Sequence, residues 1–369
     1  MSRKLIAAAV LMATVACADP DAVTSPDVVR SAAGNASVAT CTAEQGQQFL
    51  DASEYKKAIQ EFTCVIGLDP TAVEGYRGRI EAQLMLGLFS DALRDYTRVT
   101  AFVLPVHPEA EQAIIAGYQA RLDAAPDAVP ALTGQSFAYW YFFNYPAAMH
   151  VLDHLVELQP NDVYGTLFRG SSRVLQGAKR SAGAADLEHA ITLAPTSPDV
   201  RFIVADGYTY GGLPDAQRAF DEATFALDGG LDTPRIRAIL AASYLAFGNM
   251  AAAAAQIAIH LDLVTTELVA TSPLATGQSM SLALVPGRTY DIPVAAAAGE
   301  TVSIATSSRD FDDTILVLLA PDGTPVVGSD DFKGYFAGLA WVAPAGGTYR
   351  LRVTSFEGVS TGGLQVARK

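Results

Sequence analysis

The sequence has few basic residues for its length. Its 369 residues include 25 lysines and arginines but 39 aspartates and glutamates, which gives a formal net charge of -14. Proteins that hold a phosphate backbone need clusters of Lys and Arg, and no basic stripe runs through this chain. Five histidines and three cysteines leave little for a metal cluster. The composition therefore argues against a nucleic-acid partner and against a metal-centred protein.

Catalytic motifs are lacking as well. His150 and His154 have the spacing of a zinc-binding helix, but Val151 stands where the water-activating glutamate would follow, and no third ligand is evident. The chain has no Gly-x-Ser-x-Gly turn, no P-loop and no Rossmann glycine pattern after a strand. We therefore predict no catalytic residues and no cofactor, and we expect a protein that is not an enzyme.

The main uninterrupted apolar run lies at the N-terminus. Arg3 and Lys4 precede the apolar residues 5–16. This run is too short to span a bilayer and is typical of a signal peptide, here residues 1–18. The sequence thus predicts an exported protein of the bacterial periplasm or outer envelope.

Cysteine usage fits export. The sequence TVAC ending at Cys17 resembles a bacterial lipobox, which predicts a lipid anchor on Cys17; the alternative is ordinary cleavage after Ala18 and secretion. Residues 19–39 are small and polar, so we expect a flexible tether. Cys41 and Cys64 then remain as an even pair that would meet in an antiparallel helix hairpin. We predict a disulfide between them, with two separate buried thiols as the alternative.

The stretch from Ala43 to Pro70 contains two short amphipathic helical patterns and ends in proline. Neither helix can bury its apolar side alone, so the unit is expected to recur. Small residues that mark each second helix follow at spacings of 34, 56, 35, 33 and 37 residues: Ala58, Ala92, Ala148, Gly183, Ala216 and Ala253. The pattern resembles the tetratricopeptide repeat over residues 40–265. The resemblance implies an α-solenoid of antiparallel helix pairs.

The spacing of 56 residues is the main irregularity in this pattern. It exceeds one period by about 22 residues, which is one helix with its connections. Residues 108–126 supply that extra helix, beginning at Pro108 and ending before Pro126. Its pairing with the regular units stays open.

The resemblance also implies a concave groove, lined by the first helix of each pair, that holds a peptide or partner protein. Phe137, Trp140 and Tyr141 lie at i, i+3 and i+4 in the third unit, and interface hot spots favour aromatic and arginine side chains. In the alternative interpretation the extra helix covers these rings and they belong to the core. The other predicted groove residues are Arg77, Leu84, Met85, Phe168, Leu175, Arg201, Tyr208 and Arg235.

From Thr271 the helical period gives way to short alternating strands separated by turn residues, which predicts an antiparallel β-sandwich over residues 274–369. The order of the runs, with AGETVSIAT (298–306) and GGTYRLRV (346–353), resembles the bacterial pre-peptidase C-terminal domain. That resemblance implies a jelly-roll-like accessory module without peptidase activity. The eight expected strands are 280–284, 289–294, 301–306, 315–319, 324–327, 339–342, 348–353 and 363–366.

Carboxylates gather in the turns of this second domain. Aspartate oxygens at successive loops suit Ca²⁺, but aspartate is also a preferred turn residue because its side chain bonds its own backbone. We favour turn structure and predict no metal, with a calcium site as the alternative. The carboxylates concerned are Asp312, Asp313, Asp322, Asp330 and Asp331.

The fold class predicted is therefore a TPR-like α-solenoid followed by a β-sandwich. The leading functional hypothesis is a non-enzymatic exported scaffold or adaptor that holds a partner protein or peptide in the solenoid groove, with the sandwich as an accessory contact domain. Membrane contact would come only through the lipid anchor. Two alternatives stay open: an envelope glycan-binding protein that acts through the sandwich, and an accessory subunit of a secreted hydrolase or peptidase.

Overall fold

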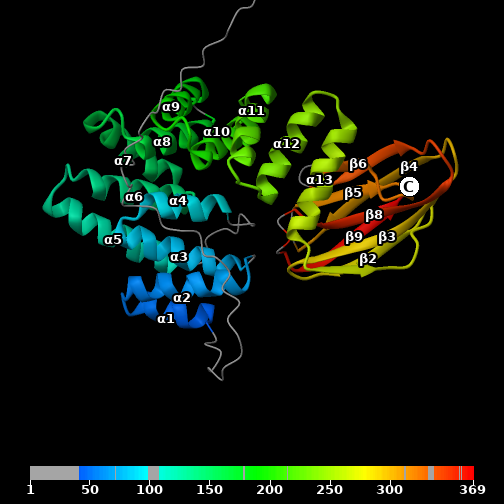
Figure 1. Ribbon diagram of the computed structural model, residues 1–369, viewed down its shortest axis with the longest axis horizontal. Coiled ribbons are helices and arrows are strands. Elements are labelled where there is room, and N and C mark those ends of the chain that lie inside the picture. Colours follow the sequence, from blue (N-terminus) through cyan, green and yellow to red (C-terminus); the bar gives the residue numbers. More distant parts are fainter. Residues whose placement is uncertain are drawn as a thin grey trace, which may run out of the picture. The chain divides into compact units, whose positions relative to one another are not determined.

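The computed structural model describes residues 41–70, 72–98, 108–177, 179–213, 215–310, 313–330, 336–356, 358 and 360–369. The predicted signal peptide, Cys17 and the tether lie outside these residues. Cys41–Lys369 forms one compact unit, in which helices precede strands (Figure 1). The described residues contain thirteen helices and nine strands. This is the order of α-solenoid and β-sandwich that the sequence predicts. None of the described helices is long and apolar enough to cross a membrane.

The helices begin where the sequence offers caps. The side chains of Thr42, Asp162, Ser197 and Thr233 each accept a hydrogen bond from a backbone N–H in the first turn of the following helix, which satisfies one of its free donors. The helices are α1 Ala43–Asp51, α2 Tyr55–Leu68, α3 Val73–Leu86, α4 Phe89–Arg98, α5 Pro108–Ala124, α6 Val129–Tyr141, α7 Tyr145–Leu158, α8 Val163–Leu175, α9 Arg180–Leu193, α10 Pro198–Tyr210, α11 Ala216–Asp228, α12 Pro234–Ala246 and α13 Met250–Val264.

Small residues let the helix pairs stack closely. The Phe62 ring of α2 lies against Gly46 of α1 and Gly78 of α3, and a Cβ atom added at Gly46 would stand 2.5 Å from Phe62 Cε1. In α9, the Leu187 side chain lies against Gly207 of α10, and the Leu187 backbone nitrogen lies close to Gly170 of α8. Close packing of this kind buries the apolar sides of the helices. The residues from α3 to α12 share one hydrophobic cluster, while Phe62 packs with Ala58 and Ala82 in a separate one.

The structure differs from the simple repeat at α4 and α5. The helix expected at 108–126 is present as α5, but it stacks as the partner of α3: its Tyr118 ring lies against Gly134 of α6, as Phe62 does against Gly78. Tyr118 also donates a hydrogen bond to the Leu84 carbonyl of α3. Helix α4 packs against α3, which precedes it, and also reaches α10, six helices later in the chain. The long spacing therefore marks a displaced α4.

The strands form two sheets that enclose a second core. One sheet has the order β1-β3-β8-β5-β6 and the other β2-β9-β4-β7. The eight expected strands are all found, together with β1, which pairs with β3 in parallel and was not expected. The strands are β1 Glu267–Ala270, β2 Ser279–Leu284, β3 Arg288–Ala296, β4 Thr301–Ser308, β5 Thr314–Leu319, β6 Pro325–Ser329, β7 Gly338–Val342, β8 Gly347–Ser355 and β9 Gly362–Arg368.

Helix α13 covers the outer face of the five-stranded sheet. Alternate residues of β5 point to opposite faces, so Leu316 and Leu318 join the core between the sheets while Ile315 and Val317 pack under Ile257 of α13. This explains why β5 is a continuous apolar run rather than an alternating one. The last helix of the solenoid and the sandwich therefore share one hydrophobic cluster.

Candidate functional site

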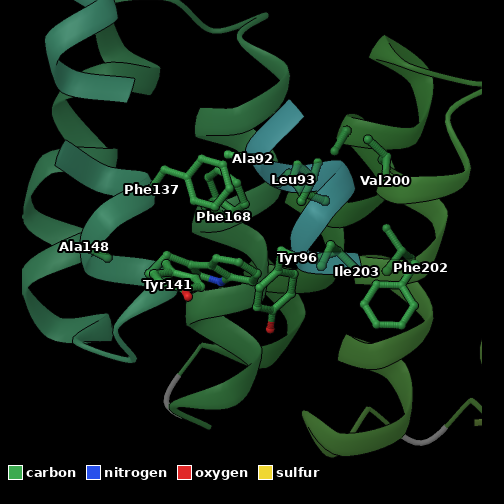
Figure 2. Packing of buried hydrophobic residues seen from close by; sticks show 14 of the residues in the cluster. Ala92, Leu93, Tyr96, Phe137, Tyr141, Ala148, Phe168, Val200, Phe202 and Ile203 are labelled. Atoms are coloured by element: carbon green, nitrogen blue, oxygen red, sulfur yellow. The ribbon is translucent and has the colours of Figure 1, made fainter. Parts of the chain in front are cut away.

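The first helices of the pairs, α1, α3, α6, α8, α10 and α12, lie side by side and form what we call the first-helix surface. Helix α4 crosses this surface between α6 and α8 on one side and α10 on the other. Figure 2 shows Leu93 and Tyr96 of α4 between the rings of Phe137 and Tyr141 and the side chains of α10, among them Ile203. The middle of the surface is therefore occupied by a helix of the same chain.

Aromatic rings hold α4 in this place. The Tyr96 ring meets the Trp140 ring edge to face, with centroids 4.8 Å apart, and the Phe168 ring lies 4.6 Å from the Trp140 ring and 4.4 Å from the Phe137 ring. Trp140 Nε1 donates to the Ser171 hydroxyl at 3.1 Å, so its polar atom is satisfied inside the cluster. Offset and edge-to-face pairs of this kind add stability beyond the area that they bury.

Two polar contacts tie down the C-terminal half of α4. Asp95 accepts two hydrogen bonds from the Arg79 guanidinium of α3, each 2.7 Å long. The Thr97 hydroxyl donates to Asp199 of α10, and Arg98 Nη1 lies 3.2 Å from the same carboxylate. Helix α4 is thus bonded to α3 and to α10.

Four of the predicted groove rings are buried beneath α4. Phe137, Trp140, Tyr141 and Phe168 all belong to the solenoid core, and Leu84 is buried between α3 and α5. A partner could not touch these side chains in this conformation, which contradicts their expected exposure in an open groove. Their burial agrees with the alternative interpretation, that the rings are core, but the helix that covers them is α4 and not α5.

The remaining predicted residues do not gather at one place. Met85 and Leu175 are half-buried. Arg201 Nη1 bonds Glu222 at 2.7 Å, and its guanidinium lies 4.5 Å from the centre of the Phe225 ring. Arg235 Nε bonds Asp206 at 2.9 Å, and its guanidinium covers the Tyr210 ring at 3.7 Å. These arginines are engaged by side chains of neighbouring helices.

Tyr208 lines an open pocket at one end of α10. Its hydroxyl donates to Glu188 at 2.9 Å. The pocket has a volume of about 380 Å³ and is walled mainly by small and apolar side chains of α10, α11 and α12, including Leu213, Ala219 and Ala246. Polar side chains such as Thr209 and Ser243 line it as well.

A second pocket, of about 190 Å³, opens between α1 and α3 near the other end of the first-helix surface. Arg77 and Glu81 of α3 line it together with Gln47 of α1, and the two α3 residues are nearly buried, at 5% and 3% exposed. Burial raises the pKa of Glu81 to about 7; Arg77 opposes this rise, while Glu74 and Asp51 add to it. The carboxyl of Glu81 therefore changes its charge close to neutral pH.

The junction of solenoid and sandwich contains a buried histidine. His260 of α13 lies between two backbone carbonyls, with Nδ1 at 2.8 Å from the Pro234 oxygen and Nε2 at 2.6 Å from the Phe356 oxygen. Burial lowers the pKa of His260 to about 4. The two carbonyls act in the opposite direction and raise it, while the positive charge of Arg235 lowers it further. A neutral ring donates to only one of the two carbonyls, through whichever nitrogen carries the proton.

The paired cysteines, and Asp322 among the carboxylates of the alternative calcium site, make contacts that stabilise the fold. Cys41 and Cys64 form a disulfide, with Cα atoms 5.9 Å apart, which agrees with the predicted pairing. Asp322 accepts a hydrogen bond from the backbone N–H of Thr324, the turn bond expected of aspartate. Asp312 and Asp331 lie outside the described residues. Within the described part of the chain, no three His, Cys, Asp or Glu side chains gather as a metal site.

Comparisons with known proteins concern the fold alone. No family model matches this chain, and no curated protein matches it. Among solved structures, a thermophilic TPR protein from Thermus thermophilus is 20% identical over 55% of this chain and 97% of its own, with a TM-score of 0.32. MamA from Desulfovibrio magneticus is 14% identical over 50% and 94%, with a TM-score of 0.37. The pre-peptidase C-terminal domain of a Bacillus anthracis collagenase is 15% identical over 28% and 99%, with a TM-score of 0.25.

Sequence reasoning missed the role of α4. Its buried residues Ala92, Leu93 and Tyr96 are spaced as one helical stripe, which the repeat pattern assigned to an ordinary second helix. The signal available was the 56-residue spacing, which showed that the repeat was interrupted but not which helix had moved.

Proposed function

We propose that this protein is an exported, non-enzymatic scaffold that holds a partner protein or peptide on its first-helix surface, with the β-sandwich as an accessory contact domain. The observation that carries the proposal is the occupied middle of that surface. Rings of α6 and α8 and the side of α10 hold α4 as a bound helix, which is a known mode of peptide recognition in grooves between helices.

Because α4 fills the middle, the partner contacts lie at the two ends that stay open. The pocket between α1 and α3 is polar and contains Arg77 and Glu81. The pocket around Tyr208 is mainly apolar. A partner that engages both would pass over α4, whose exposed residues there are Ser90 and Arg94.

Export is supported by two features of the sequence and by the disulfide. Arg3 and Lys4 precede the short apolar run, and Cys17 stands at the end of a lipobox-like sequence. Disulfides such as Cys41–Cys64 are retained in oxidising compartments. We propose a bacterial periplasmic or outer-envelope location with a lipid anchor on Cys17.

Site-specific photocrosslinking in the native envelope tests the scaffold. A photoreactive residue is placed in the full chain at Gln47 or at Tyr208, and at Glu157, which is exposed on the second helix α7, as the matched control. We expect positions 47 and 208 to crosslink to the same partner protein and position 157 to give no such product. Equal crosslinking from position 157, or none from positions 47 and 208, would show that the first-helix surface is not the binding surface.

A further inference from the structure

The pocket between α1 and α3 contains a hydrogen-bond donor and an acceptor that the fold leaves unused. Arg77 Nη1 bonds Glu74 at 3.0 Å, but among the described residues no group accepts from Arg77 Nη2. Glu81 Oε1 is likewise buried without a hydrogen-bond partner in the described chain. Both side chains line the same pocket on the first-helix surface.

Such atoms are unfavourable unless something binds them. A buried donor or acceptor without a partner costs about 1–3 kcal/mol, and more when the group is charged. The pocket volume of about 190 Å³ is far above the roughly 10–15 Å³ that one water needs. The space is therefore large enough to admit a side chain that would satisfy these groups.

The charge of the pocket selects the kind of side chain. Glu44, Glu74 and Glu81 line it against one arginine, Arg77, which Glu74 already partly neutralises. A cation would find carboxylates here, whereas a second carboxylate would be repelled. The formal charge of -14 on the whole chain likewise favours a positively charged partner.

We propose that this pocket binds a lysine or arginine side chain of the partner protein, with its cationic head on Glu81 and Glu74 and a neighbouring partner carbonyl accepting from Arg77 Nη2. This inference rests on the proposed function and gives it a chemical specificity: the partner presents a basic residue to α1 and α3.

The proposal carries a pH dependence. A cation binds best to the ionised carboxyl of Glu81, which is reached above its pKa of about 7. The charged and titratable groups around it are Arg77 and Glu74 of α3, Asp51 of α1 and Tyr141 of α6, whose own pKa is raised mainly by burial and in part by Glu81. The pKa of Glu81 lies between pH 6 and pH 8, so affinity should rise across that interval.

The test uses the full chain and a peptide with one central lysine flanked by glycine and serine, with its dissociation constant measured by saturation-transfer NMR at pH 8. We expect Glu81→Gln to weaken binding about tenfold or more, since hydrogen bonds to charged groups contribute about 1.5–3 kcal/mol. Acetylation of the peptide lysine should weaken it similarly. Glu157→Gln removes the same charge from the exposed face of α7 and should leave binding unchanged.

Three results would overturn the inference: no binding of the lysine peptide to the natural chain, equal affinity for the acetylated peptide, or equal weakening by Glu157→Gln and Glu81→Gln. A circular dichroism spectrum of Glu81→Gln that matches the natural chain shows that the variant is folded. If photocrosslinking finds the partner at position 208 while the lysine peptide fails, the basic-residue pocket is refuted and the scaffold proposal stands. If the lysine peptide binds but no partner is crosslinked, the scaffold proposal is refuted and the basic-residue pocket stands.

Discussion

Replacing Glu81 by glutamine should make the solenoid more stable at alkaline pH and leave it unchanged in acid. The folded chain raises the pKa of Glu81 from its ordinary 4.5 to about 7, because burial disfavours the charged carboxylate. The folded state therefore binds this proton more tightly than the unfolded state does. The stability that the protonated carboxyl allows is fully present below pH 4.5 and is lost as the pH rises through 7.

The size of the effect follows from the two pKa values. Each pKa unit corresponds to 1.36 kcal/mol, so ionising Glu81 in the folded chain destabilises it by about 3 kcal/mol at pH 8. Glutamine has nearly the same shape and stays neutral at every pH. The difference in free energy of unfolding between Glu81→Gln and the natural chain should thus rise from near zero at pH 4 to about 3 kcal/mol at pH 8.

Urea unfolding followed by Trp140 fluorescence measures this difference. Trp140 lies in the solenoid core, and the other tryptophan of the chain, Trp341, lies in the sandwich. A Trp341→Phe background therefore reports on the solenoid alone. The difference between variants cancels the titration of His260, which both share. A difference that stays constant from pH 4 to pH 8 would refute the reasoning, since it would mean that Glu81 titrates alike in both states.

Three further changes test other parts of the fold. Replacing Cys41 and Cys64 by serine should lower the free energy of urea unfolding by about 3 kcal/mol, because the bond closes a loop across a sequence separation of 23. Gly134→Ala places a methyl group on the Tyr118 ring and should lower the free energy of unfolding by about 1–3 kcal/mol in the same assay. His260 has a lowered pKa, so the stability that it contributes is present above pH 6.5 and is lost as the pH falls toward 4; His260→Gln should flatten this decline in a pH series of unfolding curves.

Each of these changes has a control. The natural chain in reductant should behave like the serine variant, and identical unfolding with and without the disulfide would contradict the first prediction. Gly67 has open space where a Cβ would stand, so Gly67→Ala should not destabilise α2; equal losses from Gly67→Ala and Gly134→Ala would show that the Tyr118 contact is not the cause. An unchanged acid decline in His260→Gln would mean that another group produces it.

The regular parts of the fold were predictable because their signals are local. The repeat from Ala43 to Pro70 marks each helix pair by small residues and caps that lie within a few tens of residues of one another. The strands of the sandwich alternate between faces and end at turn residues. The strand β1 was missed because it pairs in parallel with β3 and covers only Glu267–Ala270, which gives too short a pattern.

The candidate site was less predictable, because the burial of a side chain depends on which helix covers it. Phe137 and Trp140 carry the residue types of an interface, but the same rings serve as core once Tyr96 lies against Trp140. The pocket with Arg77 and Glu81 was only half foreseen. Arg77 was predicted to line the groove. Glu81 was not, because its role depends on its burial, and the spacing of residues in the sequence does not reveal burial.

The sequence by itself determined that helices precede strands, that the helices come in repeating pairs, and that Cys41 and Cys64 can meet. These properties follow from periodicity and capping, which act between near neighbours in the chain. Only the tertiary structure decided that α5 contacts both α3 and α6 while α4, which packs on α3, crosses to Asp199 of α10. That choice depends on contacts between residues about a hundred positions apart, where shape and burial act together.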